Sequence, residues 1–251
     1  VMEGKAAIFK EFANIDAVPL CINTQDTDEI VKFVKQIEPS FGGINLEDIS
    51  APRCFEVLER LEEELDIPVF HDDQDGTAIV TLAALINAAK VVIKKIADMK
   101  IVINGAGAAG LAIARLLLAY GVKDLYIADS QGLIYEGRRE MNKYKQEIAR
   151  VSNHEGLKGW KEEAMRGSDV FIGVSKSKQV TAAMIQSMNK GAVLLPMANP
   201  EPEIFPDEAY AAGAALVGTG RSDFPNQVNN ALVFPGIFRG LLDGGINKVT
   251  V

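Results

Sequence analysis

The chain has 251 residues, of which 48% are hydrophobic and 24% are charged. This length suits one large or two ordinary domains, and the composition excludes a disordered chain. The formal net charge is −8 and the pI is near 5.0, which argues against nucleic acid or an anionic membrane as the main partner. An acidic small substrate remains possible only with local positive charge or a metal to attract it.

The cysteines and the apolar stretches indicate the compartment. Cys21 and Cys54 form neither a disulfide framework nor a metal-ligand spacing, which fits a reducing compartment, and both are expected to be buried. The longest apolar region, residues 77–93, is interrupted by Asn87 and Lys90. No stretch resembles a signal peptide or a membrane span, so we expect a cytoplasmic protein without a membrane partner.

Strands and helices alternate along the first third of the chain. The sequence begins VMEGKA without an initiator methionine in first position, which suggests a cut into a longer protein. Lys5 opens an apolar, helix-like run, and a lysine alone is usually a solvated surface charge. The elements expected next are a strand at 18–22, a helix at 27–37, a strand within 41–49, a helix at 50–65 capped by Ser50, a strand at 67–70 and a helix at 76–96.

Acidic pairs stand at two successive strand ends. Glu47 and Asp48 end one strand-like segment, and Asp72 and Asp73 follow the next. In open α/β sheets, ligands gather outside the carboxyl ends of the strands, and three carboxylates there form a hard oxygen site for Mg²⁺ or Mn²⁺. On spacing alone, exposed turn and helix-cap acids are the commoner interpretation. His71 is expected to be a packed or capping residue.

Residues 100–129 have the pattern of a dinucleotide-binding βαβ unit. An apolar run leads into Gly105-x-Gly107-x-x-Gly110, helical spacing follows, and a second apolar run ends on Asp129, nineteen residues beyond the last glycine. Gly105 allows a sharp turn, Gly107 leaves room for a pyrophosphate and Gly110 lets helix and strand approach closely. The phosphates would meet the N–H groups and positive end of the helix. The alternative is a tight βα turn in another doubly wound domain.

The acid at the end of this unit bears on the choice of cofactor. Asp129 would accept hydrogen bonds from both ribose hydroxyls and repel a 2′-phosphate, so NAD is favoured, although the loop after Asp129 could admit NADP. The expected cofactor-binding residues are Gly105, Ala106, Gly107, Ala108, Ala109, Gly110, Asp129, Ser175 and Asn199.

Beyond this unit the alternation continues. The sequence predicts a loop at 132–139, helices at 142–151 and 162–165, a strand at 168–174, a helix at 184–188, a strand at 192–197, a helix at 207–212, a strand at 214–217 and a helix from 234. Ser175 follows one strand and faces where a cofactor would lie. Asn199, Asn229 and Asn230 lie at or beyond strand ends; asparagine is common in loops, but together these amides could bind a carboxylate without changing its charge.

These patterns predict an α/β fold in two parts. Residues 97–251 are expected to form a dinucleotide-binding domain of Rossmann type, with a doubly wound, mostly parallel sheet. Residues 1–96 are expected to form part of an α/β substrate- and metal-binding domain.

Several long runs resemble the bacterial malic enzymes, over essentially the whole chain. They are VMEGKA at 1–6, FGGINLEDISAPRCF at 41–55, IPVFHDDQDGTA at 67–78, VINGAGAAG at 102–110, MANPEPE at 197–203 and GRSDFPNQVNNALVFPGIFRG at 220–240. The resemblance implies oxidative decarboxylation of (S)-malate to pyruvate and CO₂, with NAD(P)⁺ reduced and Mg²⁺ or Mn²⁺ required. It also implies a homodimer acting on a small molecule, without nucleic acid.

The resemblance also implies roles for individual residues. Lys5 matches the general base and contacts substrate. The metal ligands it implies are Glu47, Asp48 and Asp73, and the malate-contacting residues are Asn199 and Asn230, with Asn229 beside them. The tyrosine that is the family's general acid and a substrate-binding arginine lie upstream of the lysine motif and are absent here.

The remaining departures leave two alternatives open. Asp75 stands where relatives often have His or Gln, and the chain ends before the family's C-terminal helices. We expect these 251 residues alone to be catalytically poor. The alternatives are another NAD-dependent hydroxy-acid or amino-acid dehydrogenase, and a non-catalytic nucleotide-binding module.

Overall fold

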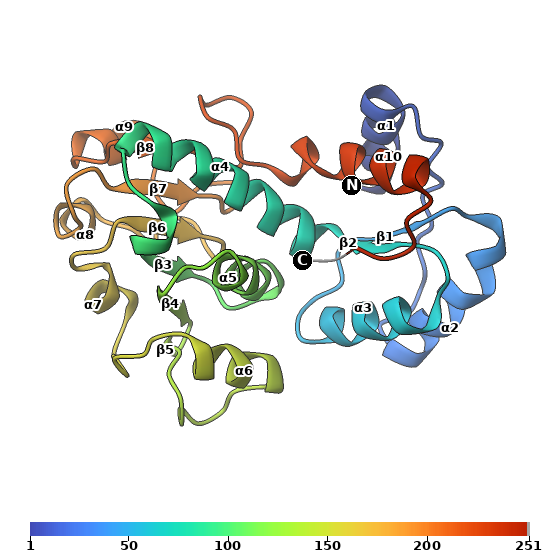
Figure 1. Ribbon diagram of the computed structural model, residues 1–251, viewed down its shortest axis with the longest axis horizontal. Helices are drawn as coiled ribbons and strands as arrows, with labels where there is room; N and C mark the ends of the chain where they lie inside the picture. Colours follow the sequence, from blue (N-terminus) through green and yellow to red (C-terminus); the bar gives the residue numbers. More distant parts are fainter. Residues whose placement is uncertain (250–251) are drawn as a thin grey trace. The chain divides into compact units, whose positions relative to one another are not determined.

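The computed structural model describes residues 1–249 and divides the chain into two compact units. One unit contains residues 1–76 and the chain from Asn230 onward, and the other is Thr77–Asn229 (Figure 1). The boundary expected between residues 96 and 97 therefore differs from the observed division. Helix α4 (Thr77–Val92) packs against α5 (Ala108–Ala119) of the second unit. Helix α10 (Phe234–Gly244) packs against α1 (Met2–Ala13) of the first. Each helix belongs to the unit that buries its apolar face.

The first unit is built on a short parallel strand pair. Its elements are α1 (Met2–Ala13), α2 (Thr27–Ile37), η1 (Glu38–Ser40), β1 (Ile44–Leu46), α3 (Arg53–Glu64), β2 (Val69–His71), the π-helical turn η2 (Asp72–Gly76), η4 (Asn230–Leu232) and α10. Strands β1 and β2 are in register from Ile44 opposite Val69 to Leu46 opposite His71. Apolar side chains of α2 and α3, among them Ile30, Val34, Val57 and Leu61, form its core with Leu46 and Val69.

Three local predictions in this unit are wrong. Residues 18–22 form no strand: Val18, Leu20 and Ile22 are 58%, 39% and 36% exposed, so this run has no buried face to hold it in a sheet. Cys21 is exposed for the same reason, whereas Cys54 is buried as expected. Ser50 does not cap α3, which begins after Pro52 with no side-chain cap.

The second unit contains a six-stranded sheet in the order β5-β4-β3-β6-β7-β8. The strands are β3 (Lys100–Asn104), β4 (Asp124–Asp129), β5 (Gly132–Leu133), β6 (Val170–Gly173), β7 (Val193–Pro196) and β8 (Leu216–Val217). All pairs are parallel except β4 with β5. The predicted α/β class with a mostly parallel sheet is confirmed, while β5 replaces the start of a predicted loop.

Helices flank this sheet on both sides. They are α4, α5 (Ala108–Ala119), α6 (Lys143–Val151), α7 (Lys161–Met165), α8 (Ala182–Gln186) and α9 (Pro206–Ala211), with the short turn η3 (Ile96–Asp98) before β3. In Figure 1, α5 and α6 lie on one side of the strands and α7 and α8 on the other. Strands β6 and β7 are buried along their whole length, which explains their continuous apolar sequences.

Among the described residues, one helical stretch is long and apolar enough to cross a membrane. It is Asp72–Val92, which is partly buried in the structure. Length and composition alone are weak evidence, because core helices of globular proteins meet the same criteria. Most of this stretch is α4, which packs against α5.

Candidate active site

Three carboxylates converge in the first unit at the ends of its two strands. Because β1 and β2 are parallel neighbours, the residues that follow them lie at one edge. Ligand oxygens of Glu47, Asp48 and Asp73 all lie within 4.8 Å of one another, and the Asp48 N–H donates to Asp73 Oδ2 at 3.2 Å. Three carboxylate oxygens that converge in this way are the donor type that a hard cation such as Mg²⁺ or Mn²⁺ prefers.

Lys5 lies beside this cluster. Its Nζ is 2.9 Å from Glu47 Oε2, forms an ion pair with Asp72 Oδ2 and lies 4.5 Å from the centroid of the Phe234 ring. The lysine side chain is only 13% exposed, and that of Asp72 is fully buried. Helix α1 packs on α10, and the ring centroids of Phe9 and Phe234 are 4.7 Å apart. This packing holds Lys5 in its position. The solvated surface lysine that is the usual case does not describe Lys5.

The electrostatics of the cluster favour a cation. Burial raises the pKa of Glu47, Lys5 lowers it, and Asp73 and Asp48 raise it further, so the pKa stands above its usual value. Neighbouring carboxylates disfavour one another's ionised form. A divalent ion among them would reverse this balance.

His71 is a packed residue, as expected. It is fully buried at the end of β2 and lies outside the three-acid cluster. Its backbone N–H donates to Asp75 Oδ2 at 3.3 Å, and burial lowers the pKa of its imidazole. His71 is therefore a neutral core residue next to the acids.

Asn230 also belongs to the first unit and lies against the turn η2. A Cβ placed at Gly76 would meet Asn230 Cβ at 3.2 Å and would overlap Asp72 Oδ1. Because Gly76 has no Cβ, Asp72 and Asn230 can both lie close to the backbone of η2. The structure thus brings together Lys5, the acids and Asn230, and the sequence had not assigned Asp72 as the partner of Lys5.

The glycine turn of the second unit has the expected geometry. Gly105 has φ +126°, and a Cβ there would lie 2.6 Å from the Val174 carbonyl oxygen. A Cβ at Gly110 would overlap the Gly105 carbonyl, whereas Gly107 faces open space. Helix α5 begins after Gly107 with no side-chain cap, so the N–H groups of its first turn are available to a phosphate.

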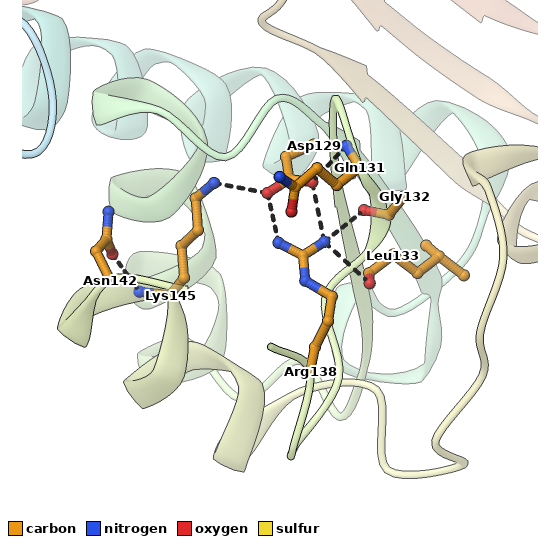
Figure 2. Close-up of polar contacts among 7 residues, drawn as sticks. All are labelled: Asp129, Gln131, Gly132, Leu133, Arg138, Asn142 and Lys145. Carbon is orange, nitrogen blue, oxygen red and sulfur yellow. Dashed lines mark hydrogen bonds and ion pairs between the residues drawn. The ribbon is translucent and has the colours of Figure 1, made fainter. Parts of the chain in front are cut away.

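Asp129, at the end of β4, is held by two cations (Figure 2). Arg138 donates from Nη1 to Oδ1 at 2.9 Å and from Nη2 to Oδ2 at 2.6 Å, and Lys145 Nζ lies 2.6 Å from Oδ2. The N–H of Gln131 donates to Oδ1 at 2.9 Å. Burial alone would raise the pKa of Asp129, but the bonds from Arg138 and Lys145 outweigh it and lower the pKa to about 2. Neither cation was predicted from the sequence.

The remaining predicted residues of this unit form two groups. Ser175 Oγ accepts from Asn104 Nδ2 at 2.8 Å, directly before the glycine turn. Asn229 Nδ2 donates to the Gly220 carbonyl at 2.9 Å, and a Cβ at Gly220 would lie 3.3 Å from Asn199 Nδ2. Asn199 and Asn229 therefore meet around Gly220 within the second unit.

Comparison with known proteins identifies the family. The family model described as the malic enzyme NAD-binding domain matches residues 74–251, and the malic enzyme N-terminal domain matches residues 1–62. The chain belongs to the malic enzyme family. The resemblance noted in the sequence runs is thereby confirmed, and residues 74–251 match the family's NAD-binding domain.

Relatives and a solved structure agree. The bifunctional malic/malolactic enzyme of Bacillus subtilis is 57% identical over 97% of this chain and 60% of its own length. The NAD-dependent malic enzyme of Geobacillus stearothermophilus is 54% identical over 97% of this chain and 51% of its own length. The crystal structure of the NAD-dependent malic enzyme of Thermotoga maritima has a TM-score of 0.96 at 51% identity and covers 99% of this chain and 66% of that one. The chain thus spans about half to two thirds of the length of these malic enzymes.

Proposed function

We propose that the intact protein catalyses the metal-dependent oxidative decarboxylation of (S)-malate to pyruvate and CO₂, with reduction of NAD(P)⁺. One observation carries the proposal: in a chain with a family-matched NAD-binding domain, Lys5 lies 2.9 Å from Glu47, a member of the three-carboxylate cluster. Base and metal ligands are then adjacent, as proton removal from a metal-bound alcohol requires.

The metal belongs at Glu47, Asp48 and Asp73. There, Mg²⁺ or Mn²⁺ would polarise the C2 oxygen of malate and stabilise the charge that develops when CO₂ leaves. The cluster supports this role because its oxygens converge without any imidazole or thiol, the donor set that hard cations prefer.

Lys5 is proposed to remove the proton from the C2 hydroxyl as hydride passes from C2 to NAD(P)⁺. It must be neutral to do so, and a divalent cation on Glu47 favours the neutral form. Asp72, fully buried and paired with Lys5, holds the amine in place. The amides of Asn199, Asn229 and Asn230 are proposed to bind substrate carboxylate oxygens without adding charge.

NAD⁺ is the proposed preferred cofactor, bound by residues 105–110, Asp129, Ser175 and Asn199. The glycine turn supports binding of the pyrophosphate, and the position of Asp129 at the end of β4 supports its contact with the adenosine ribose. NADP⁺ remains a possible cofactor because Arg138 and Lys145 offset the charge of Asp129. From the family resemblance we further propose a cytoplasmic homodimer.

The test is malate-dependent reduction of NAD⁺ by the full-length polypeptide, with Mn²⁺ or with a chelator, while pyruvate and CO₂ are measured. Lys5→Ala should lower kcat by about 10²- to 10⁴-fold, the usual contribution of a general base. Lys10→Ala is the matched control, because Lys10 lies on the same helix in a surface ion pair with Asp16. Malate turnover that is unchanged in Lys5→Ala would remove the assignment, and NADH formation without CO₂ would favour another hydroxy-acid dehydrogenase.

A further inference from the structure

A buried carboxylate without a cation joins the ends of two neighbouring strands of the NAD-binding unit. Glu203 is 0% exposed. Its Oε1 accepts the N–H of Ser175, which follows β6, at 3.1 Å, and its Oε2 accepts the N–H of Ala198, which follows β7, at 3.1 Å. Burial raises the pKa of this carboxyl group. Within the described residues no lysine, arginine or histidine forms an ion pair with Glu203, so backbone donors alone satisfy its oxygens.

The contacts of Glu203 extend to the predicted cofactor residues. Ser175 Oγ accepts from Asn104, the last residue of β3, at 2.8 Å. Ala198 directly precedes Asn199. The Glu203 side chain therefore fixes the backbone at the ends of β6 and β7. Through Ser175 it is also linked to Asn104 at the end of β3, immediately before Gly105.

The backbone of β6 approaches the Glu203 carboxylate closely. A Cβ at Gly173, the last residue of β6, would overlap the Glu203 carboxylate. The Glu203 carbonyl accepts the N–H of Val180 at 3.2 Å, and Ile204 is buried in the core of this unit. Glu203 is thus held by its own backbone, and its side chain is pre-oriented toward the two donors.

The sheet order shows which half of the dinucleotide is concerned. The glycine turn follows β3, and Asp129 is the last residue of the neighbouring strand β4, so the adenosine half belongs to that side of β3. Strands β6 and β7 lie on the other side of β3, where the nicotinamide half must extend. Ser175 and Ala198 stand at the ends of these two strands.

We propose that Glu203 is a positioning residue for the nicotinamide half of the dinucleotide, which it serves by holding the backbone at Ser175 and at Ala198–Asn199. The inference deepens the proposed function and rests on its dinucleotide-binding part. A carboxylate can accept both N–H groups, whereas glutamine would direct its NH₂ at one of the donors and leave that N–H unpaired. A carboxylate buried without a cation is costly, so it is expected to persist only where it performs such a task.

The experiment measures binding of NAD⁺ and of AMP to the full-length polypeptide by calorimetry, for wild type and Glu203→Gln. We expect Kd for NAD⁺ to rise about 10-fold, as loss of a hydrogen bond to a charged group implies, while Kd for AMP changes less than about 2-fold. Amide hydrogen exchange at Ser175 and Ala198 should become faster, and exchange in the turn at 105–110 should not. Glu201→Gln is the matched control, since its side chain is 46% exposed and forms an ion pair with Lys178 at 3.3 Å.

Each outcome decides the question. Unchanged NAD⁺ affinity in Glu203→Gln overturns the proposal, and so does an equal loss of NAD⁺ and AMP affinity, which would indicate a general structural role. If Glu203→Gln does not fold, Glu203→Asp, which keeps the charge and shortens the reach, must weaken NAD⁺ selectively. Wild type that binds no NAD⁺ would instead defeat the proposed function.

Discussion

The environment of Asp129 changes what its charge can do. An isolated carboxylate at the end of β4 would repel a 2′-phosphate, but this one contacts Arg138 through both oxygens and Lys145 through one (Figure 2). The three side chains are 8% to 20% exposed, so their charges are only weakly screened. Two cations against one anion leave one net positive charge beside the ribose position. Cofactor preference therefore depends on three residues, not on Asp129 alone.

Lys145 is the residue whose removal tests this. Lys145→Met keeps much of the side-chain volume and leaves the Asp129–Arg138 pair neutral, so we expect KM for NADP⁺ to rise about 10-fold while KM for NAD⁺ changes little. The measurement is the KM for both nucleotides with the full-length polypeptide. Lys143→Met is the matched control, because Lys143 is exposed on the same helix. Equal losses for the two nucleotides would show that Lys145 does not sense the 2′-phosphate.

The sequence predicts the position of Asp129 but not its neighbours, for a physical reason. The apolar run of a strand and the spacing of the glycines are patterns of neighbouring residues, and they are enough to place Asp129 at the end of β4. The contacts of Arg138 and Lys145 depend on the path of the loop after β5 and on α6, whose first turn Asn142 caps by accepting the Lys145 N–H at 3.0 Å. Asp72 is a similar case, because its pairing with Lys5 joins segments far apart in the sequence.

At the scale of one helix, α3 carries Glu62 at a position where burial and a neighbouring acid disfavour its ionised form. Burial raises the pKa of Glu62 to about 7, with a further contribution from the negative charge of Asp75. The folded state then binds more protons than the unfolded state between about pH 4.3, the usual pKa of glutamate, and about pH 7. The free energy of unfolding should therefore fall as pH rises through this window, since ionised Glu62 is disfavoured in the folded protein.

Replacing this acid should stabilise the protein at alkaline pH. Glu62→Gln removes the ionisation, so we expect a gain of about 1 kcal/mol at pH 8 and little or no gain at pH 4; the partial exposure of Glu62 reduces the effect through solvent screening. Urea unfolding at both pH values measures it. Glu63→Gln, at the exposed neighbouring position, controls for the change in net charge. A gain of equal size at pH 4 would contradict a titration effect.

Some helices and strands can be predicted from sequence patterns and others cannot. The unit β3–α5–β4 was predicted because buried parallel strands are continuously apolar and its turn needs glycine. The run at 18–22 is equally apolar, yet it is exposed and forms no strand. Strand β5 consists of Gly132 and Leu133 and pairs antiparallel with β4. Such elements depend on a partner that no local pattern reveals.

For the whole molecule, the division into two units follows from packing at both ends of the chain. The first unit takes its last helix from the segment after Asn230, and α1 packs on that helix. The carboxylate cluster and Lys5 lie in this unit, and the glycine turn and Asp129 lie in the other. The alternation of strands and helices in the sequence does not reveal that the chain from Asn230 onward packs with the first unit. The sequence therefore predicts a single boundary, at the start of the dinucleotide-binding pattern.

This division predicts that metal and dinucleotide stabilise different parts of the chain. Mn²⁺ binds only the closed site and therefore stabilises it against local opening. At about 100 times the Kd of Mn²⁺, backbone amides whose hydrogen exchange requires this opening should exchange up to about 100-fold more slowly. We expect this slowing at β1, which Glu47 and Asp48 follow, and at η2, which contains Asp73. NAD⁺ alone should slow exchange at residues 103–111. Hydrogen exchange with mass spectrometry on the full-length polypeptide, without malate, measures both.

Asp73→Asn separates the two effects. It weakens a three-carboxylate site, because a neutral amide replaces one anionic ligand, so the Mn²⁺-dependent slowing should disappear while the effect of NAD⁺ at 103–111 stays. Asp66→Asn removes an exposed acid of the same unit and should change neither. If Mn²⁺ still slows exchange at β1 in Asp73→Asn, the ion binds elsewhere. The role of Lys5 as a base beside the metal would then lose its basis, since Lys5 contacts Glu47 of this cluster.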